Sequence, residues 1–129
     1  MNNVELVKQG YLNFSSGNIE AVLANFHPEI VWEESTGLPY ISGDGISHGP
    51  QEIVENIFTP LPEHIDSFHI DIKELFGSND KVTMVGHYTG TWKATGKKFK
   101  ANAIHVWTIK DGKITHMFQT ADTAEMIGE

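Results

Sequence analysis

Hydrophobic positions in the first part of the chain recur at the three- and four-residue spacing of amphipathic helices. The first such segment ends at Ser15-Ser16-Gly17, a sequence typical of a helix C-terminus. A second helix is expected to begin at the N-cap Asn18 and to end at His27-Pro28, because the residue before proline avoids the helical conformation. The predicted apolar faces are formed by Val4, Leu6, Val7, Tyr11, Leu12 and Phe14 in the first helix, and by Ile19, Val22, Leu23 and Phe26 in the second.

The pattern then changes to that of a strand. Residues 30–32 read Ile-Val-Trp, which favours a strand that carries Glu33 and Glu34 to its end. Carboxylates at such a position, beside aromatic and aliphatic side chains, are candidates for a raised pKa and for proton chemistry.

A loop and a third helix are predicted next. Residues 36–50 are rich in glycine, serine and proline, and they indicate a long mobile loop of the kind that often serves as a lid. Pro50 is expected to open a helix that continues to about Phe58. Pro60 and Pro62 are expected to break it.

Strand patterns dominate the rest of the chain. Alternating or β-branched segments predict strands at residues 68–76, 82–93, 99–109 and 114–121, and the turns between them contain glycine, asparagine or aspartate. A short helical tail is expected at residues 122–127. Helices followed by antiparallel strands predict the α+β class, with a curved sheet that encloses a pocket.

Composition limits the classes of function. The chain has 129 residues, of which 40% are hydrophobic, so one domain spanning residues 1–129 is expected. It carries 17 acidic and 9 basic residues and a net charge of −8, which argues against nucleic acid or an anionic membrane as a partner. Cysteine is absent. Without a signal-peptide pattern or an apolar run of membrane-spanning length, a cytoplasmic protein is expected.

Three segments resemble the nuclear transport factor 2-like superfamily, in its branches related to ketosteroid isomerase and to the SnoaL-like polyketide cyclases. They are GNIEAVLANFHPEIVWEE, ISHGPQEIVENIF and HVWTIKDGKITHMFQTAD, at residues 17–34, 46–58 and 105–122. The resemblance implies a cone-shaped, mostly antiparallel sheet wrapped by three N-terminal helices, the cystatin-like α+β barrel. It also implies a small apolar ligand in the cone and a homodimer formed through the outer face of the sheet.

Strand alternation agrees with a second contact on the outer face. Ile104 and Val106 share one face with Asn102, whereas Ala101, Ala103, His105 and Trp107 share the other. Both faces are therefore partly apolar, as expected for a strand covered by helices on one side and by a partner on the other. A monomer with modestly apolar outer residues is the other interpretation.

The resemblance to the isomerases implies specific catalytic residues. Their base, an acid at the end of the first strand, aligns with Glu34. Glu33 must point to the opposite face, and the alternative is that both glutamates are solvated at a strand end. The oxyanion-binding groups align with Tyr11 and His105, where a neutral histidine replaces an aspartic acid. The segment between Tyr11 and Gly17 is one residue short, which could turn Tyr11 out of the pocket.

The resemblance to the cyclases implies a different acid–base residue, Asp122, near the end of the last strand. Gln119 is expected to share its strand face, and Asp122 and His105 are expected to form a carboxylate–imidazole pair. Asp122 is equally suited to be the N-cap of the terminal helix.

Several aromatic residues are expected to be core residues or to line the cavity for a flat apolar ligand. Tyr40 lies in the glycine-rich loop and is the candidate lid residue. The others are Trp32, Phe58, Phe76, Trp92, Trp107 and Phe118. Seven histidines are present, but HxH, HExxH and cysteine are absent, so no metal site is expected.

The leading hypothesis is cofactor-independent proton transfer on a small apolar carbonyl compound, as an isomerase, cyclase or hydratase. Glu34 or Asp122 would be the base, with His105 and Tyr11 polarising the carbonyl, and with Trp32, Tyr40, Phe58, Trp107 and Gln119 in contact with the substrate. A non-catalytic ligand-binding protein and a dimeric interaction module remain alternatives, because one fold serves all three functions.

Overall fold

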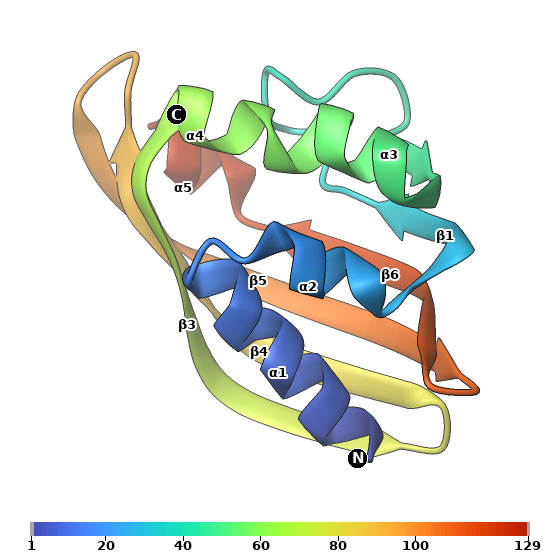
Figure 1. Cartoon of the computed structure of the whole chain (residues 1–129). Helices are drawn as coiled ribbons and strands as arrows, with labels where there is room; N and C mark the ends of the chain where they lie inside the picture. Colours follow the sequence, from blue (N-terminus) through green and yellow to red (C-terminus); the bar gives the residue numbers. More distant parts are fainter. Residues whose placement is uncertain (1, 129) are drawn as a thin grey trace.

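The computed structural model describes residues 2–128 as a curved six-stranded sheet with helices on its concave face (Figure 1). The order of the strands is β2-β1-β6-β5-β4-β3, and the sheet is not closed, so β2 and β3 form its edges. Among the strand pairs within residues 2–128, only β1 and β6 run parallel. The strands are β1 (Phe26–Glu33), β2 (Ile46–His48), β3 (Ile65–Ser78), β4 (Lys81–Trp92), β5 (Lys97–Lys110) and β6 (Lys113–Ala121).

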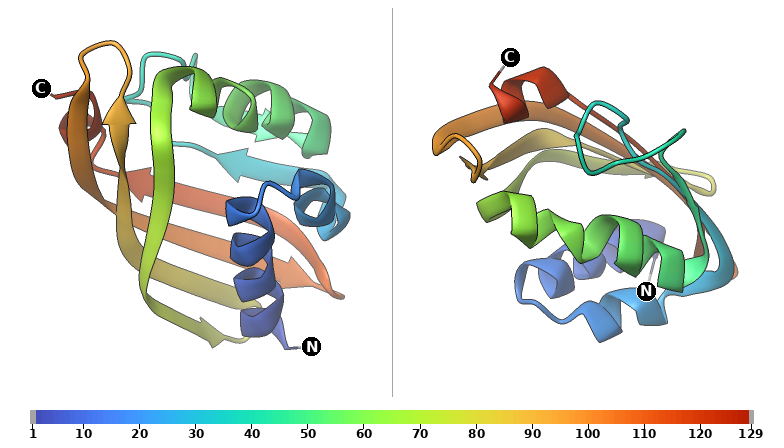
Figure 2. Two further views of the ribbon diagram at one scale, coloured as in Figure 1. Left: turned by 60° about the vertical axis from the view of Figure 1, so that its left-hand side comes forward. Right: turned by 90° about the horizontal axis from the view of Figure 1, so that it is seen from above.

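Helices form the second layer of the molecule (Figure 2). Helices α1 (Asn3–Ser15) and α2 (Ile19–Ala24) lie below a longer helical run made of α3 (Gly49–Ile53), η1 (Val54–Phe58) and α4 (Pro60–His64). The short α5 (Thr123–Ile127) packs on β5 at the C-terminal end. This arrangement confirms the predicted α+β class and the curved sheet wrapped by N-terminal helices. No helix within residues 2–128 is long and apolar enough to cross a membrane.

The end of the second helix differs from the prediction. Helix α2 stops at Ala24, and Phe26, His27 and Pro28 belong to β1 rather than to the helix and its break. The backbone N–H of Ile114 donates to the carbonyl of Asn25 over 2.8 Å, so pairing with β6 begins immediately after the helix. The register shifts between Phe26 and Val31, and this irregularity accommodates a proline that has no N–H to donate.

The third helical segment ends at Phe58, as predicted, but helical backbone resumes at Pro60, which the prediction of a break at Pro60 and Pro62 missed. Val54–Phe58 forms a wider π-helical turn, in which the Thr59 N–H donates to the Val54 carbonyl over 2.8 Å. Helix α4 then starts with both prolines in its first turn, where backbone N–H groups need no partner inside the helix.

The predicted loop 36–50 is partly ordered by pairing with β1. Its last part forms β2, and the Glu34 N–H donates to the Gly45 carbonyl over 2.9 Å. Gly45 has a positive φ of 74°, and a Cβ there would lie 2.6 Å from the Glu34 carbonyl oxygen. Glycine is therefore required where the loop passes this close to the end of β1.

The predicted alternation of β5 is confirmed. Ala101, Ala103, His105 and Trp107 are buried, whereas Ile104 is 39% exposed on the outer face. The prediction that Phe76 and Phe118 are core residues is wrong, because they are 52% and 43% exposed. Both lie on the convex side of the sheet, which the helices do not cover.

Candidate functional site

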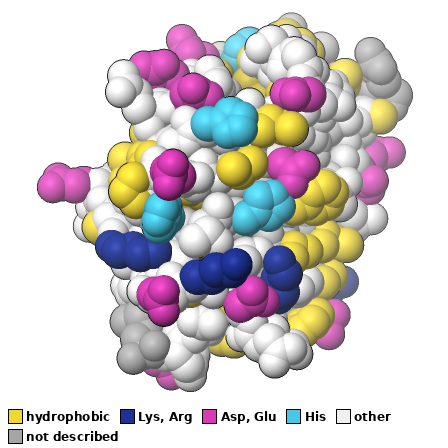
Figure 3. Space-filling model, turned by 90° about the vertical axis from the view of Figure 1, so that its right-hand side faces the viewer, with side chains coloured by type: hydrophobic (Ala, Val, Ile, Leu, Met, Phe, Trp, Pro, Cys, Tyr) yellow, Lys and Arg dark blue, Asp and Glu magenta, His cyan; other side chains and the backbone are white. Residues whose placement is uncertain are grey.

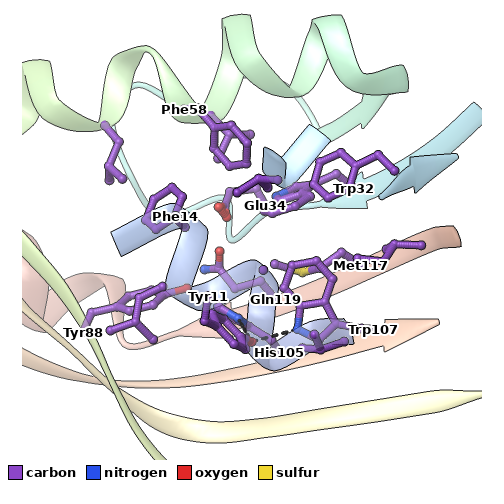
Figure 4. Close-up of a pocket in the computed structure, with 18 of the residues that line it drawn as sticks. Tyr11, Phe14, Trp32, Glu34, Phe58, Tyr88, His105, Trp107, Met117 and Gln119 are labelled. Atoms are coloured by element: carbon purple, nitrogen blue, oxygen red, sulfur yellow. Dashed lines mark hydrogen bonds between the residues drawn. The ribbon is translucent and has the colours of Figure 1, made fainter. Parts of the chain in front are cut away.

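A cavity of about 80 Å³ lies between the concave face of the sheet and the helices (Figure 4). A single buried water needs roughly 10–15 Å³ on a comparable measure, so the cavity accommodates several waters or a small organic molecule. Its walls are mainly hydrophobic and come from helices, strands and the loop before β2. The Phe, Tyr and Trp rings of the wall belong to Tyr11, Phe14, Phe26, Trp32, Tyr40, Phe58, Phe68, Tyr88 and Trp107.

Only one of the two adjacent glutamates enters this cavity. Glu34 lines it, just beyond the end of β1. Glu33 points to the other side of the sheet, where its Oε2 accepts a hydrogen bond from Nε2 of His116 over 2.5 Å. Burial raises the pKa of Glu34 from 4.5 to about 8, and the Trp32 side chain, which faces the carboxyl group as a hydrogen-bond donor, acts in the opposite direction. Glu34 is therefore mostly protonated at neutral pH, and it becomes a base in the range where enzymes use one.

Gln119 can interact with either protonation state of Glu34. With its amide nitrogen toward the cavity, Gln119 donates to both carboxylate oxygens of Glu34 and accepts from the Ser35 hydroxyl over 3.0 Å, which suits the ionised carboxylate. With the amide reversed, Nε2 donates to Ser35 Oγ over 3.0 Å and the amide oxygen faces Glu34, which suits a protonated carboxyl that donates to it. Gln119 can therefore serve the ionised carboxylate as a donor and the protonated carboxyl group as an acceptor.

A second polar group on the cavity wall is centred on His105. Tyr11 Oη lies 2.7 Å from His105 Nδ1, and the Tyr88 hydroxyl contacts His105 Nε2. The indole N–H of Trp107 donates to Tyr11 Oη over 2.8 Å. Burial lowers the pKa of His105 to about 3, so its ring is neutral and carries one proton. Burial also raises the pKa of Tyr11 and of Tyr88, so both hydroxyls stay protonated.

This hydrogen-bonded group contains one more polar hydrogen than it has internal hydrogen bonds. Trp107, Tyr11, His105 and Tyr88 carry one polar hydrogen each, but only three contacts join them. If His105 is protonated at Nε2, Tyr11 donates to Nδ1 and the hydroxyl of Tyr88 remains free. If it is protonated at Nδ1, the free hydroxyl is that of Tyr11. In either tautomer one tyrosine can donate to a ligand oxygen.

The structure brings most of the predicted site residues together. Glu34, Tyr11 and His105 line one cavity, and Tyr11 is not turned away despite the shortened segment before Gly17. The five predicted substrate-contact residues also line it, namely Trp32, Tyr40, Phe58, Trp107 and Gln119.

The predicted pairing of Asp122 with His105 is wrong. Asp122 is exposed and does not line the cavity. Gln119 and Asp122 are three positions apart, so strand alternation directs them to opposite faces, and the expectation that they share a face is also wrong. Asp122 occupies the N-cap position of α5, but its side chain makes no capping hydrogen bond.

Sequence reasoning missed Tyr88. Its burial could have been predicted from strand alternation, because Tyr88 has the same parity along β4 as the apolar residues Val82 and Met84, and all three are buried. Within residues 2–128 no group of three or more histidine, aspartate and glutamate side chains is arranged to hold a metal ion.

Comparison with known proteins identifies the family. The model of the SnoaL-like domain matches residues 7–117. An NTF2-like protein from Burkholderia thailandensis E264 is 34% identical, with a TM-score of 0.87 over 95% of this chain and 92% of its own. TerC, co-crystallised with polyporic acid, is 25% identical, with a TM-score of 0.84 over 98% of both chains. None of the curated proteins compared with the chain matches it. The chain therefore belongs to the SnoaL-like family, within the nuclear transport factor 2-like superfamily.

Proposed function

We propose that the protein catalyses proton transfer next to a carbonyl group in a small, mostly apolar molecule, without a cofactor. One observation carries this proposal: a buried carboxyl group with a pKa of about 8 shares an apolar cavity with a free tyrosine hydroxyl. The carboxylate can remove a proton from carbon, and the hydroxyl can stabilise the oxyanion that results.

The proposed step balances without another reactant. Ionised Glu34 takes a proton from the carbon beside the carbonyl, and the electron pair of the broken C–H bond moves to the carbonyl oxygen. The resulting enolate accepts a hydrogen bond from Tyr11 or Tyr88, whichever hydroxyl the His105 tautomer leaves free. Protonated Glu34 then returns its proton to the same or another atom of the conjugated system, which gives exchange or isomerisation. Attack of the enolate on a second carbonyl of the same molecule would give cyclisation.

The local polarity supports this assignment. Burial of Glu34 makes its carboxylate a stronger base than one in water, and Gln119 can stabilise the ionised form by donating to both carboxylate oxygens. Neutral, buried tyrosine hydroxyls such as those of Tyr11 and Tyr88 are effective donors to a developing charge. A small-molecule ligand also agrees with the co-crystallisation of TerC with polyporic acid.

Hydrogen–deuterium exchange tests the proposal without knowledge of the natural substrate. Small neutral ketones, including 1-tetralone, are incubated with the protein in D₂O at pH 8.5, and loss of the α-proton signals is followed by NMR. We expect exchange well above the buffer rate for at least one ketone that binds. Ketones that bind, as shown by native mass spectrometry, without any accelerated exchange would instead indicate a binding protein.

We also propose that the protein forms a homodimer through the outer face of the sheet. Ile104 and Phe118 are 39% and 43% exposed there, and Val106, which pairs in register with Phe118, connects them. Figure 3 views the molecule from the right-hand side of Figure 1, where hydrophobic side chains lie between charged residues of both signs. A contiguous apolar surface on a sheet typically marks an interface.

The dimer proposal predicts that Phe118→Glu halves the molecular mass in solution, because the substitution buries a charge in the interface. Sedimentation equilibrium at micromolar concentration measures the mass. Leu12→Glu is the matched control, because Leu12 is 53% exposed on α1, away from the outer face. A monomeric wild-type protein would contradict the proposal.

A further inference from the structure

A groove of about 320 Å³ lies on the surface between α1 and β3, outside the cavity of the candidate site. Figures 1 and 2 show α1 alongside β3, which is an edge strand of the sheet. The polar residues of the groove, Lys8, Ser15 and His69, are exposed. The rest of its lining is mostly apolar and consists of Tyr11, Leu12, Phe14, Phe68, Ile70 and Ile72. The proton transfer proposed above gives this groove no role.

Two exposed hydrophobic side chains border the groove. Leu12 is 53% exposed and Ile72 is 37% exposed. Ile72 has the same parity along β3 as Ile70, which lines the cavity, so it does not belong to the outer face of the sheet. A single exposed apolar side chain is ordinary, but two that border one apolar groove form a surface suited to an apolar ligand.

The groove and the cavity share a wall. Four side chains line both spaces, namely those of Tyr11, Phe14, Phe68 and Ile70. Phe14 and Phe68 are only half-buried, and their rings meet edge to face with centroids 6.4 Å apart. Phe14 also contacts Phe58 across the cavity, with centroids 5.5 Å apart (Figure 4). Rotation of the Phe14 and Phe68 rings would join the two spaces.

The backbone beside Phe68 is suited to such a movement. Ser67 has a positive φ of 55°, and the register with β4 shifts between Asp66 and His69. This irregularity leaves Ser67 and Phe68 without partners in the strand ladder. Within residues 2–128 no strand pairs with the other edge of β3. Phe68 is therefore held less firmly than a cavity residue in the interior of the sheet, such as His105.

We propose that the groove is an outer binding site that continues the cavity and takes an aliphatic chain of the ligand. The chain passes between Phe14 and Phe68, because it is the narrowest apolar group that two neighbouring rings can admit. Its end then contacts Leu12 and Ile72, so the groove selects ligands by chain length. The inference rests on the proposed function only in taking a carbonyl group as the end held in the cavity.

A series of methyl ketones, from 2-hexanone to 2-decanone, tests the inference by equilibrium binding. The titrations are followed by tryptophan fluorescence, because Trp32 and Trp107 line the cavity. For the wild-type protein we expect the affinity to rise about three- to fourfold with each added CH₂, the usual gain from burial of one methylene group. Native mass spectrometry should show one ketone bound per protomer.

Leu12→Gln combined with Ile72→Thr removes apolar surface from the groove and leaves the cavity lining unchanged. Both replaced side chains are exposed, and both new residues suit their helix or strand, so the fold should be retained. We expect this double variant to bind 2-decanone about five- to tenfold more weakly, and 2-hexanone within about twofold of the wild type. Ile104→Thr is the matched control, because Ile104 is 39% exposed on the outer face of the sheet, and it should change neither affinity.

Nuclear Overhauser contacts locate the chain directly in the wild-type protein. The terminal methyl group of bound 2-decanone should contact the methyl groups of Leu12 and Ile72. Absence of these contacts, an equal effect of the double variant on both ketones, a second ketone bound per protomer, or no binding of any ketone in the series would overturn the inference. Selection by chain length without exchange of α-protons would refute the proposed function and leave the outer site standing. Exchange that continues while the groove contributes nothing to binding would do the reverse.

Discussion

Replacement of Glu34 by glutamine is expected to lower the rate of α-proton exchange in a bound ketone by about 10²- to 10⁴-fold, the usual contribution of a general base. Glutamine has the same shape and still pairs with Gln119, so the cavity and the binding of the ketone should persist. We therefore expect the turnover rate to decrease while the affinity for the ligand stays unchanged. Exchange followed by NMR, together with calorimetric binding of the same ketone, separates the two.

The neighbouring glutamate provides a matched control. Glu33→Gln makes the same chemical change one residue away, but Glu33 faces the other side of the sheet and pairs with His116. We expect this variant to exchange the ketone at the wild-type rate. If both variants retained wild-type exchange, another group would be the base. If both lost it equally, the effect would come from structure or net charge rather than from proton transfer.

Removal of both tyrosine hydroxyls is expected to lower exchange by about 10²- to 10³-fold, comparable to loss of an oxyanion-hole donor. Each single variant, Tyr11→Phe or Tyr88→Phe, should lose much less, roughly two- to fivefold. The reason is the tautomerism of His105: when one hydroxyl is absent, the other can still be left free to donate. The double variant has no hydroxyl in this group, and its defect should exceed the product of the two single defects.

Thermal unfolding of the three variants distinguishes catalysis from stability. Tyr11→Phe leaves Trp107 Nε1 without its acceptor, so this variant should also be less stable than Tyr88→Phe. Exchange rates are therefore measured well below the unfolding midpoint of each variant. If the fold-loss in exchange rate of the double variant equals the product of the two single losses, the hydroxyls act independently. In that case His105 does not exchange one donor for the other.

The fold could be largely predicted because the alternation and spacing of apolar residues are strong signals in this chain. Period-two alternation alone places His105 and Trp107 on one face of β5, opposite Ile104 and Val106. The same rule requires that only one of Glu33 and Glu34 enter the cavity. Which of the two enters depends on how β1 meets the helices, and resemblance to the isomerases supplied that answer.

The failed predictions involved features that depend on tertiary context. Pro60 and Pro62 are read as helix breakers in isolation, but a π turn places them at the start of α4, where a missing N–H costs nothing. Phe118 has the character of a core residue, yet its parity on β6 places it outside. The hydrogen-bonded group around His105 joins residues that are far apart in sequence. Tyr11 and His105, for example, are separated by 94 positions, so no local pattern could reveal their contact.

The pH dependence of ketone exchange by the wild-type protein tests the role of Glu34 most directly. Exchange requires the ionised carboxylate, and burial raises its pKa to about 8. The ionised fraction therefore increases about tenfold per pH unit below that value and levels off above it. After subtraction of the buffer rate, we expect exchange to rise between pH 6 and 8 and to reach a plateau above 8, and this profile to be absent from Glu34→Gln. A rate that is constant or that falls between pH 6 and 8 would show that Glu34 is not the base.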